Sequence, residues 1–187
     1  MSPVTPREHH VGDTIRRLRE LRKMSVRSLA MTADFSPSFI SQLENGQVSP
    51  SISSLERIAL ALGASISDFF RDADREGAAG LVVRSSQRQR YESVWSKAQI
   101  ENLGVQGSRL RPLLITVEPN GSSGKKAHRR PYDEFAFVLE GSIKLELNGE
   151  EIILETGDAA STPAQKPVRW VNESDRPAKI LVISAGE

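Results

Sequence analysis

Four polar side chains in one short segment have the spacing and the chemistry to read nucleic-acid bases. They recur every three or four positions through residues 37–45 and comprise Ser38, Ser41, Gln42 and Asn45. In a helix, residues with this spacing share one face. The face is uncharged and rich in hydrogen-bonding groups; Gln can pair with adenine through two hydrogen bonds, and Ser can bond several bases. It could also be the polar surface of a helical hairpin, so the neighbouring elements must decide.

Two short amphipathic helices are expected to position this face. The first has one apolar stripe at i, i+3, i+4 and i+7, formed by Val26, Leu29, Ala30 and Ala33. The second begins after a break just wide enough for a tight turn, because Ser36 is a good N-cap and Pro37 a good first helical residue. Gly46 ends it.

Three further helices are predicted around this pair. One covers about residues 13–23, and another, which Ser51 or Ser53 could cap, carries an apolar stripe that ends before Gly63. A short fifth helix over 67–72 would pack Phe69 and Phe70 beneath the others. The pattern is thus a bundle of five helices.

Residues 11–71 resemble the helix-turn-helix domain of phage repressors, Cro and the xenobiotic-response-element (XRE) family. The resemblance rests on three runs in the same order, SLA, FSPSFISQLENG and PSISSLERIALALG. It implies a λ-repressor-like, all-α domain that binds double-stranded DNA through the second helix of the motif.

The same resemblance assigns individual residues to DNA. It implies that Ser38 and Gln42 face bases, and that the positions near the DNA backbone are Ser25, Arg27, Ser36 and Phe39. Pro37 replaces a polar residue often found there, which removes one possible base contact. We therefore expect a DNA-binding surface formed by Ser25, Arg27, Ser36, Pro37, Ser38, Phe39, Ser41, Gln42 and Asn45.

The resemblance also implies a structural ion pair between Arg19 and Glu44. The pair would be partly buried and would join the first helix of the domain to the helix that reads bases. Loss of either partner should cost more than loss of a surface pair, because it strands a desolvated charge.

Composition sets limits on location and partners. The chain has 187 residues, no cysteine and a net charge of +1, so it cannot form disulfides and whole-chain charge gives no support for DNA binding. Locally, residues 14–33 hold six basic side chains against one acidic one. No run approaches the roughly 18 apolar residues of a membrane span, and the N-terminal residues lack the apolar core of a signal peptide. We expect a cytoplasmic protein without a membrane partner.

The second half of the chain has a different texture. Residues 72–80 read as a polar linker, and beyond them apolar residues alternate with period two between Gly, Pro, Asn and Asp. Many short strands without helices indicate an all-β sandwich or barrel. The predicted organisation is α + β in two domains: a helix-turn-helix domain over 1–71, a linker over 72–80 and a β domain over 81–187.

Two segments of the β domain resemble the paired motifs of the cupin family, a double-stranded β-helix or jelly roll. The first motif is matched by His128, Arg130, Glu134 and Gly141, and the second by Gly157, Pro163, Val168 and Asn172. The likeness covers about residues 108–185. It departs from the family where Arg130 and Val168 stand at positions that are usually His, and where Gln165 stands at a usual Gly.

These departures weigh against a bound metal. A cupin metal centre normally uses three His and one carboxylate, of which only His128 and Glu134 remain. Arg130 keeps its proton and brings positive charge, and Val168 has no lone pair to donate. We expect neither a metal nor another cofactor.

A barrel interior with polar and apolar walls is expected instead. If strand alternation holds, the ligand pocket is lined by His128, Arg130, Tyr132, Glu134, Val168 and Trp170. Such a pocket suits a small organic molecule, and Arg130 could hold a carboxylate or phosphate by its planar fork. Alternatively, Arg130 pairs with Glu134 and closes the space.

The sequence-level hypothesis is a ligand-responsive transcriptional regulator that is not an enzyme. A homodimer would bind a pseudo-palindromic operator, because one small helix reads few base pairs. A small-molecule effector would act through the cupin domain. Two alternatives stay open: an iron-dependent cupin oxidase or epoxidase that carries a helix-turn-helix domain, and an interaction protein whose barrel only dimerises.

Overall fold

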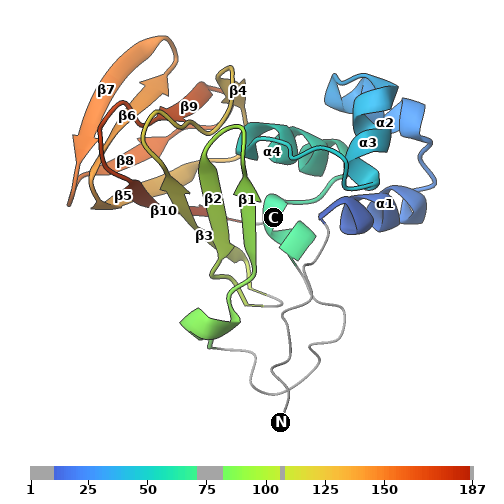
Figure 1. Ribbon diagram of the computed structural model, residues 1–187, viewed down its shortest axis with the longest axis horizontal. Coiled ribbons are helices and arrows are strands. Elements are labelled where there is room, and N and C mark those ends of the chain that lie inside the picture. Colours follow the sequence, from blue (N-terminus) through green and yellow to red (C-terminus); the bar gives the residue numbers. More distant parts are fainter. Residues whose placement is uncertain (1–10, 71–81, 106–107, 186–187) are drawn as a thin grey trace.

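The computed structural model describes residues 11–70, 82–105 and 108–185. It has an N-terminal group of helices beside a C-terminal β domain (Figure 1), which confirms the predicted fold class. The predicted linker, residues 72–80, lies outside the described residues. None of the described helices is long and apolar enough to span a membrane.

The helical domain contains four α-helices and one 3-10 helix in its described part. These elements are α1 (Val11–Leu21), α2 (Val26–Ala33), α3 (Pro37–Glu44), α4 (Ile52–Ala61) and η1 (Ile66–Phe70). Their apolar stripes meet in one core, whose fully buried side chains include Ile15, Leu29, Ile40, Leu55 and Leu62. Apolar periodicity in the sequence is therefore what assembles the bundle.

The predicted fifth α-helix is instead the 3-10 helix η1. Its five residues allow little more than one helical turn, for which the tighter 3-10 hydrogen-bonding pattern is common. Phe69 is buried in the core as expected, whereas the side chain of Phe70 is outside the described part.

Serine hydroxyls start three of the helices. Ser25 accepts a hydrogen bond from the Ser28 backbone N–H at 3.0 Å, and Ser36 accepts one from the Phe39 N–H at 3.2 Å. Ser51 caps α4 in the same way. Each cap satisfies one of the backbone N–H groups left free at a helix start, so the predicted start of α3 at Ser36 and Pro37 is confirmed.

Two sheets form the β domain. The larger has the order β1-β2-β3-β10-β5-β8 and consists of β1 (Arg90–Ser93), β2 (Ala98–Asn102), β3 (Leu110–Val117), β5 (Glu134–Glu140), β8 (Ala159–Thr162) and β10 (Ala178–Ala185). The smaller has the order β4-β9-β6-β7 and consists of β4 (His128–Arg129), β9 (Pro167–Val171), β6 (Ser142–Leu147) and β7 (Glu150–Glu155). A short 3-10 helix, η2 (Ser85–Gln87), precedes β1. The β1–β2 hairpin precedes the segment, about residues 108–185, in which the cupin motifs were found.

Alternation along the strands fills the space between the sheets. In β5 the inward residues Ala136 and Val138 are buried, and in β10 Ile180 and Val182 are buried. Trp170 of β9 is the largest fully buried side chain of the described chain. This is the packing expected when two sheets face each other.

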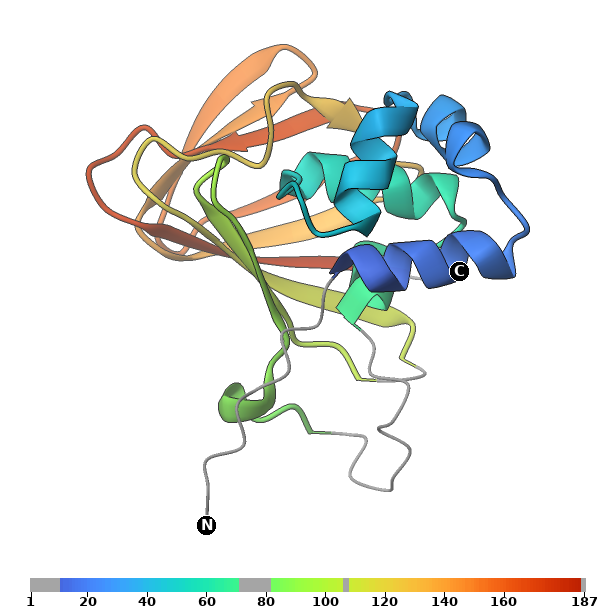
Figure 2. The same ribbon diagram turned by 45° about the vertical axis from the view of Figure 1, so that its right-hand side comes forward.

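Helix α4 joins the helical domain to the β domain, lying between the other helices and the barrel in both views (Figures 1 and 2). The Ser53 backbone N–H donates to the Ser123 carbonyl at 2.9 Å, and the Tyr91 hydroxyl donates to the Pro50 carbonyl at 2.7 Å. The approach is so close that a Cβ at Gly124 would lie 1.8 Å from Ser53 Oγ. The two domains are therefore packed directly on each other.

Candidate functional site

The outer face of α3 carries the residues predicted to read bases. Ser38, Ser41 and Gln42 are exposed on the helix, and Pro37 is exposed at its first turn. Asn45 is exposed at the C-terminal end, where its side-chain oxygen accepts a hydrogen bond from Arg16 Nη2 at 2.6 Å. The α3 face thus offers hydrogen-bonding groups without charge, and Asn45 already has a partner.

The residues predicted near the DNA backbone divide into two kinds. Ser25 and Ser36 are exposed N-caps, so they mark the helix starts where backbone N–H groups favour phosphate. Arg27 is exposed in the first turn of α2. Phe39 is half-buried, and its ring stacks on Phe35 with centroids 4.7 Å apart, so packing occupies much of its surface.

A buried ion pair fixes α3 against α1. Arg19 Nε lies 2.6 Å from Glu44 Oε1, and Arg19 Nη2 lies 2.8 Å from Glu44 Oε2, a two-point contact. The hydrogen bond to Glu44 raises the pKa of Arg19. Close approach of the helices also needs Gly12, since a Cβ there would lie 2.3 Å from the Leu43 carbonyl oxygen.

Arg57, which the sequence reading did not single out, braces the turn between α2 and α3. From α4 its Nη2 donates to the carbonyl oxygens of Ala33 and Asp34, at 2.7 and 2.8 Å. Its guanidinium also lies over the Phe35 ring, 4.3 Å from the centroid. Asp34 itself adopts the left-handed conformation, with φ of 55°, which lets the chain reverse. Helix α4 therefore holds the turn that orients α3.

In the β domain, the predicted pocket residues lie together at the end of the barrel that faces α4. Register places His128 of β4 opposite Val168 of β9, and Trp170 follows two residues later with its side chain buried. Arg130 Nη1 lies 2.8 Å from Glu134 Oε2, and both side chains are only 5% exposed. Tyr132, which lies between Arg130 and Glu134 in the sequence, is half-buried.

A carboxylate from the helical domain completes this group. Glu56 of α4 is buried, with Oε1 3.1 Å from Arg130 Nε and Oε2 3.2 Å from Arg130 Nη2. Its Oε2 also forms an ion-pair contact with His128 Nε2. We call Glu56, His128, Arg130 and Glu134 the barrel cluster. Glu56 therefore contacts two of the residues that were predicted to line the ligand pocket, His128 and Arg130.

Sequence reasoning missed Glu56, although one signal was present. Glu56 lies four residues after Ile52 and three before Ala59, and both are buried. A carboxylate on the apolar stripe of a helix needs a buried partner. The stripe could have flagged the residue, but not its partners 72 and 74 positions later.

Burial and neighbouring charges shift the pKa values of the two carboxyls of the barrel cluster in opposite directions. Burial favours the neutral form of Glu56, but Arg130 and His128 outweigh it and lower its pKa to about 2. Burial raises the pKa of Glu134 to about 7, with Arg130 opposing and Glu56 adding to the rise. Burial likewise raises the pKa of Tyr132. Near neutral pH the cluster thus holds one charged carboxylate, Glu56, whereas the pKa of Glu134 lies close to neutrality.

The barrel cluster does not fit a cupin metal. Arg130, whose pKa is raised by Glu56 and Glu134 despite its burial, places a permanent positive charge among the would-be donors. Val168, opposite His128, offers no donor atom. Over the described residues, no group of three or more His, Asp or Glu side chains is placed to hold a metal ion. The donor set is therefore wrong for the chemistry of a metal cupin.

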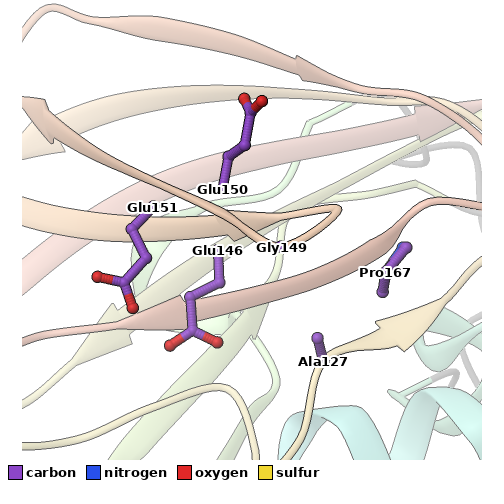
Figure 3. Close-up of a pocket in the computed structure, with 6 residues that line it drawn as sticks. All are labelled: Ala127, Glu146, Gly149, Glu150, Glu151 and Pro167. Carbon is purple, nitrogen blue, oxygen red and sulfur yellow. The ribbon is translucent and has the colours of Figure 1, made fainter.

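A separate hollow of about 130 Å³ lies on the outside of the smaller sheet (Figure 3). It is lined by Ala127, Glu146, Gly149, Glu150, Glu151 and Pro167. Glu146 is paired with Arg169 and Glu151 with Lys144, while Glu150 points away from both in Figure 3. A lining with acidic and no basic side chains is unsuited to an anionic ligand.

Both domains match known families. Residues 15–69 match the helix-turn-helix family and residues 113–184 match the cupin domain family. Together the matches define a DNA-binding helix-turn-helix module joined to a cupin module.

Similar proteins share the whole two-domain arrangement. The HTH-type transcriptional regulator PuuR of Escherichia coli is 25% identical over 170 residues, which are 91% of each chain. An HTH_3 family transcriptional regulator from Vibrio cholerae superposes with a TM-score of 0.74 at 24% identity, over 96% of this chain and 97% of that one. The chain thus combines a helix-turn-helix domain of the XRE type with a C-terminal cupin domain, the arrangement to which these regulators are similar.

An enzyme shares the fold more distantly. The iron(II) form of HppE, the hydroxypropylphosphonic acid epoxidase, superposes with a TM-score of 0.51 at 22% identity, over 95% of this chain and 98% of that one. At this identity the likeness concerns the fold alone.

Proposed function

We propose that the protein is a sequence-specific DNA-binding transcriptional regulator whose cupin domain senses a small molecule. The observation that carries this proposal is the exposed, uncharged polar face of α3, held in place by the buried Arg19–Glu44 pair and braced at its turn by Arg57. Such a face suits direct readout in the major groove. Exposed Arg27 and the capped starts of α2 and α3 would contact phosphates.

The proposed working form is a homodimer on a pseudo-palindromic operator. The outer face of the larger sheet supports it, because it carries apolar side chains in register across three strands: Pro112, Leu114, Phe135, Phe137, Leu181 and Ile183. Leu139 lies next to them, where the register of β5 and β10 shifts. Phe135 and Leu139 are each 45% exposed in the single chain. A contiguous apolar face of this kind is typical of an interface, and two-fold symmetry would double the DNA site.

The cupin domain would act as a sensor rather than as an enzyme. Its polar groups converge on one buried place, as in a binding site, yet the donor set lacks what an iron oxidase or epoxidase needs. Because the proposed regulator binds DNA, we propose that it acts in the cytoplasm. We therefore propose that the regulator responds to a small anionic effector, which binds to the cupin domain without a metal.

Selection of bound sites from a random duplex library, followed by sequencing, tests the DNA-binding part. The wild-type chain should enrich a two-fold symmetric motif, and Gln42→Ala should relax base preference at one position of each half-site. Gln99→Ala, on β2 of the barrel, is the matched control and should leave the motif unchanged. Absence of any enriched motif with the wild-type protein would refute the proposal.

A further inference from the structure

The DNA-binding domain supplies a side chain to the inside of the sensor domain. Glu56 is 4% exposed and reaches from α4 to both His128 and Arg130. Its two oxygens face Arg130 Nε and Nη2 at 3.1 and 3.2 Å, the two-point geometry by which Arg holds a carboxylate. The cupin interior thus already holds a carboxylate, and that carboxylate belongs to the chain itself.

The barrel cluster is poorly suited to being a fixed structural joint. A buried ion pair gains little over well-packed apolar residues, because both charges lose their hydration. Moreover, one buried polar atom of the cluster, His128 Nδ1, has no hydrogen-bond partner among the described residues. Buried groups in native proteins are usually satisfied, and exceptions call for an explanation. A site whose occupant is exchanged provides one.

We propose that Glu56 is an internal competitor, which fills the anion-binding site of the cupin domain until an effector with a carboxylate displaces it. The effector would take over the contacts of Glu56 with Arg130 and His128, so the two cannot bind at once. This inference rests on the proposed function as a regulator and names the chemical class of its effector.

Displacement of Glu56 would reach the DNA-reading unit through the next residue. Glu56 points into the barrel, whereas Arg57 holds the α2–α3 turn by its contacts with the Ala33 and Asp34 carbonyl oxygens. Two adjacent residues of α4 therefore contact different domains: Glu56 contacts the β domain, and Arg57 contacts the helix-turn-helix motif. When the carboxylate leaves, α4 loses its deepest contact with the barrel, while the helix-turn-helix unit stays attached to α4.

The contacts beside Glu56 define what must open. Ser53 N–H donates to the Ser123 carbonyl, and Gly124 packs against Ser53 with no room for a side chain. An effector entering between α4 and the barrel would weaken these contacts. The apparent affinity of the effector is then its intrinsic affinity multiplied by the fraction of molecules in which Glu56 has left the site, as expected when a ligand binds only the open state.

Acetate, which reproduces the end of a glutamate side chain, is the probe for the test. Binding to the full chain is followed by NMR titration against chloride at equal ionic strength. Glu56→Gln keeps the side-chain shape but loses the charge that pairs with Arg130, so it should bind acetate at least tenfold more tightly than wild type. Glu101→Gln, another buried and ion-paired carboxyl, is the control and should match wild type. Should Glu56→Gln not fold, Glu56→Ala replaces it with the same expectation.

A second measurement reports the opening itself. Saturating acetate should increase hydrogen exchange of the Ser53 amide in wild type at least tenfold, since its bond to Ser123 must weaken. Equal acetate affinity in wild type and the Glu56 variant, or unchanged Ser53 exchange at saturation, would overturn the inference. Either result would leave the regulator proposal intact if the wild-type chain still selects a DNA motif, whereas failure of that selection alone would refute the proposed function.

Discussion

Replacing Arg19 by methionine removes the ion pair that orients α3 while keeping a side chain of similar length. Arg19 loses two hydrogen bonds to Glu44 and one to the Met24 carbonyl, and Glu44 stays behind at 4% exposure. Breaking a buried pair on one side costs about 3–5 kcal/mol. Arg16 Nε remains 3.4 Å from Glu44 Oε2, so the loss should fall at the lower end, about 3 kcal/mol. For a chain of this size that corresponds to a Tm lower by about 6–12 °C.

The assay is unfolding followed by two signals. Circular dichroism at 222 nm reports mainly the helices, and fluorescence reports the barrel, because both tryptophans, Trp95 and Trp170, lie there. Arg17→Met, an exposed change on the same helix, should shift stability by less than about 0.5 kcal/mol. The double variant Arg19→Met with Glu44→Leu should recover part of the loss, because no charge is stranded. If Arg19→Met cost no more than Arg17→Met, the pair would not be what holds α3.

Three further results are expected. First, the folded-state pKa of Glu134 is raised from 4.5 to about 7, so the stability that Glu134 contributes is fully present below pH 4.5 and is lost as the pH rises to about 7. The free energy of unfolding, measured by chemical denaturation across this pH range, should therefore change less with pH in Glu134→Gln than in wild type. Second, Gln42→Ala should cost about 1–3 kcal/mol of discrimination at one base per half-site, whereas Arg27→Ala should weaken all sequences alike and flatten the dependence of affinity on salt in fluorescence anisotropy. Third, Gly124→Ala should lower Tm by forcing Ser53 away from the barrel, and a Tm equal to that of wild type would show that α4 is not seated there as described.

Local signals in the sequence were sufficient to predict the helical domain. Ser36 and Pro37 carry a start signal that acts within one turn, and apolar spacing marks the buried face of each helix. The 3-10 form of η1 was not predictable, because in so short an element the competing hydrogen-bond patterns differ little in energy. The cupin fold followed from motif spacing and strand alternation, but the β1–β2 hairpin did not, since its sequence lacks a clear alternation.

The barrel cluster shows where sequence reasoning stops. Motif positions and alternation brought His128, Arg130 and Glu134 to one place, because β4, β5 and the short loop that joins them carry these residues. The partner that fills this place comes from another domain, and no local pattern specifies a contact between Glu56 and Arg130. Such a contact depends on how two separately patterned units dock, which is set by shape and charge over the whole interface.

The contact between α4 and the barrel also limits how this protein can evolve. Grafting the helical domain onto a different cupin would leave the Glu56 carboxylate facing an interior without its guanidinium and imidazole, and a side chain in place of Gly124 would block the seat of Ser53. Recombination at the junction between the domains is therefore costly even though it cuts neither core. We expect the two halves to be inherited as a matched pair, with changes in α4 accompanied by changes at the barrel end that it covers.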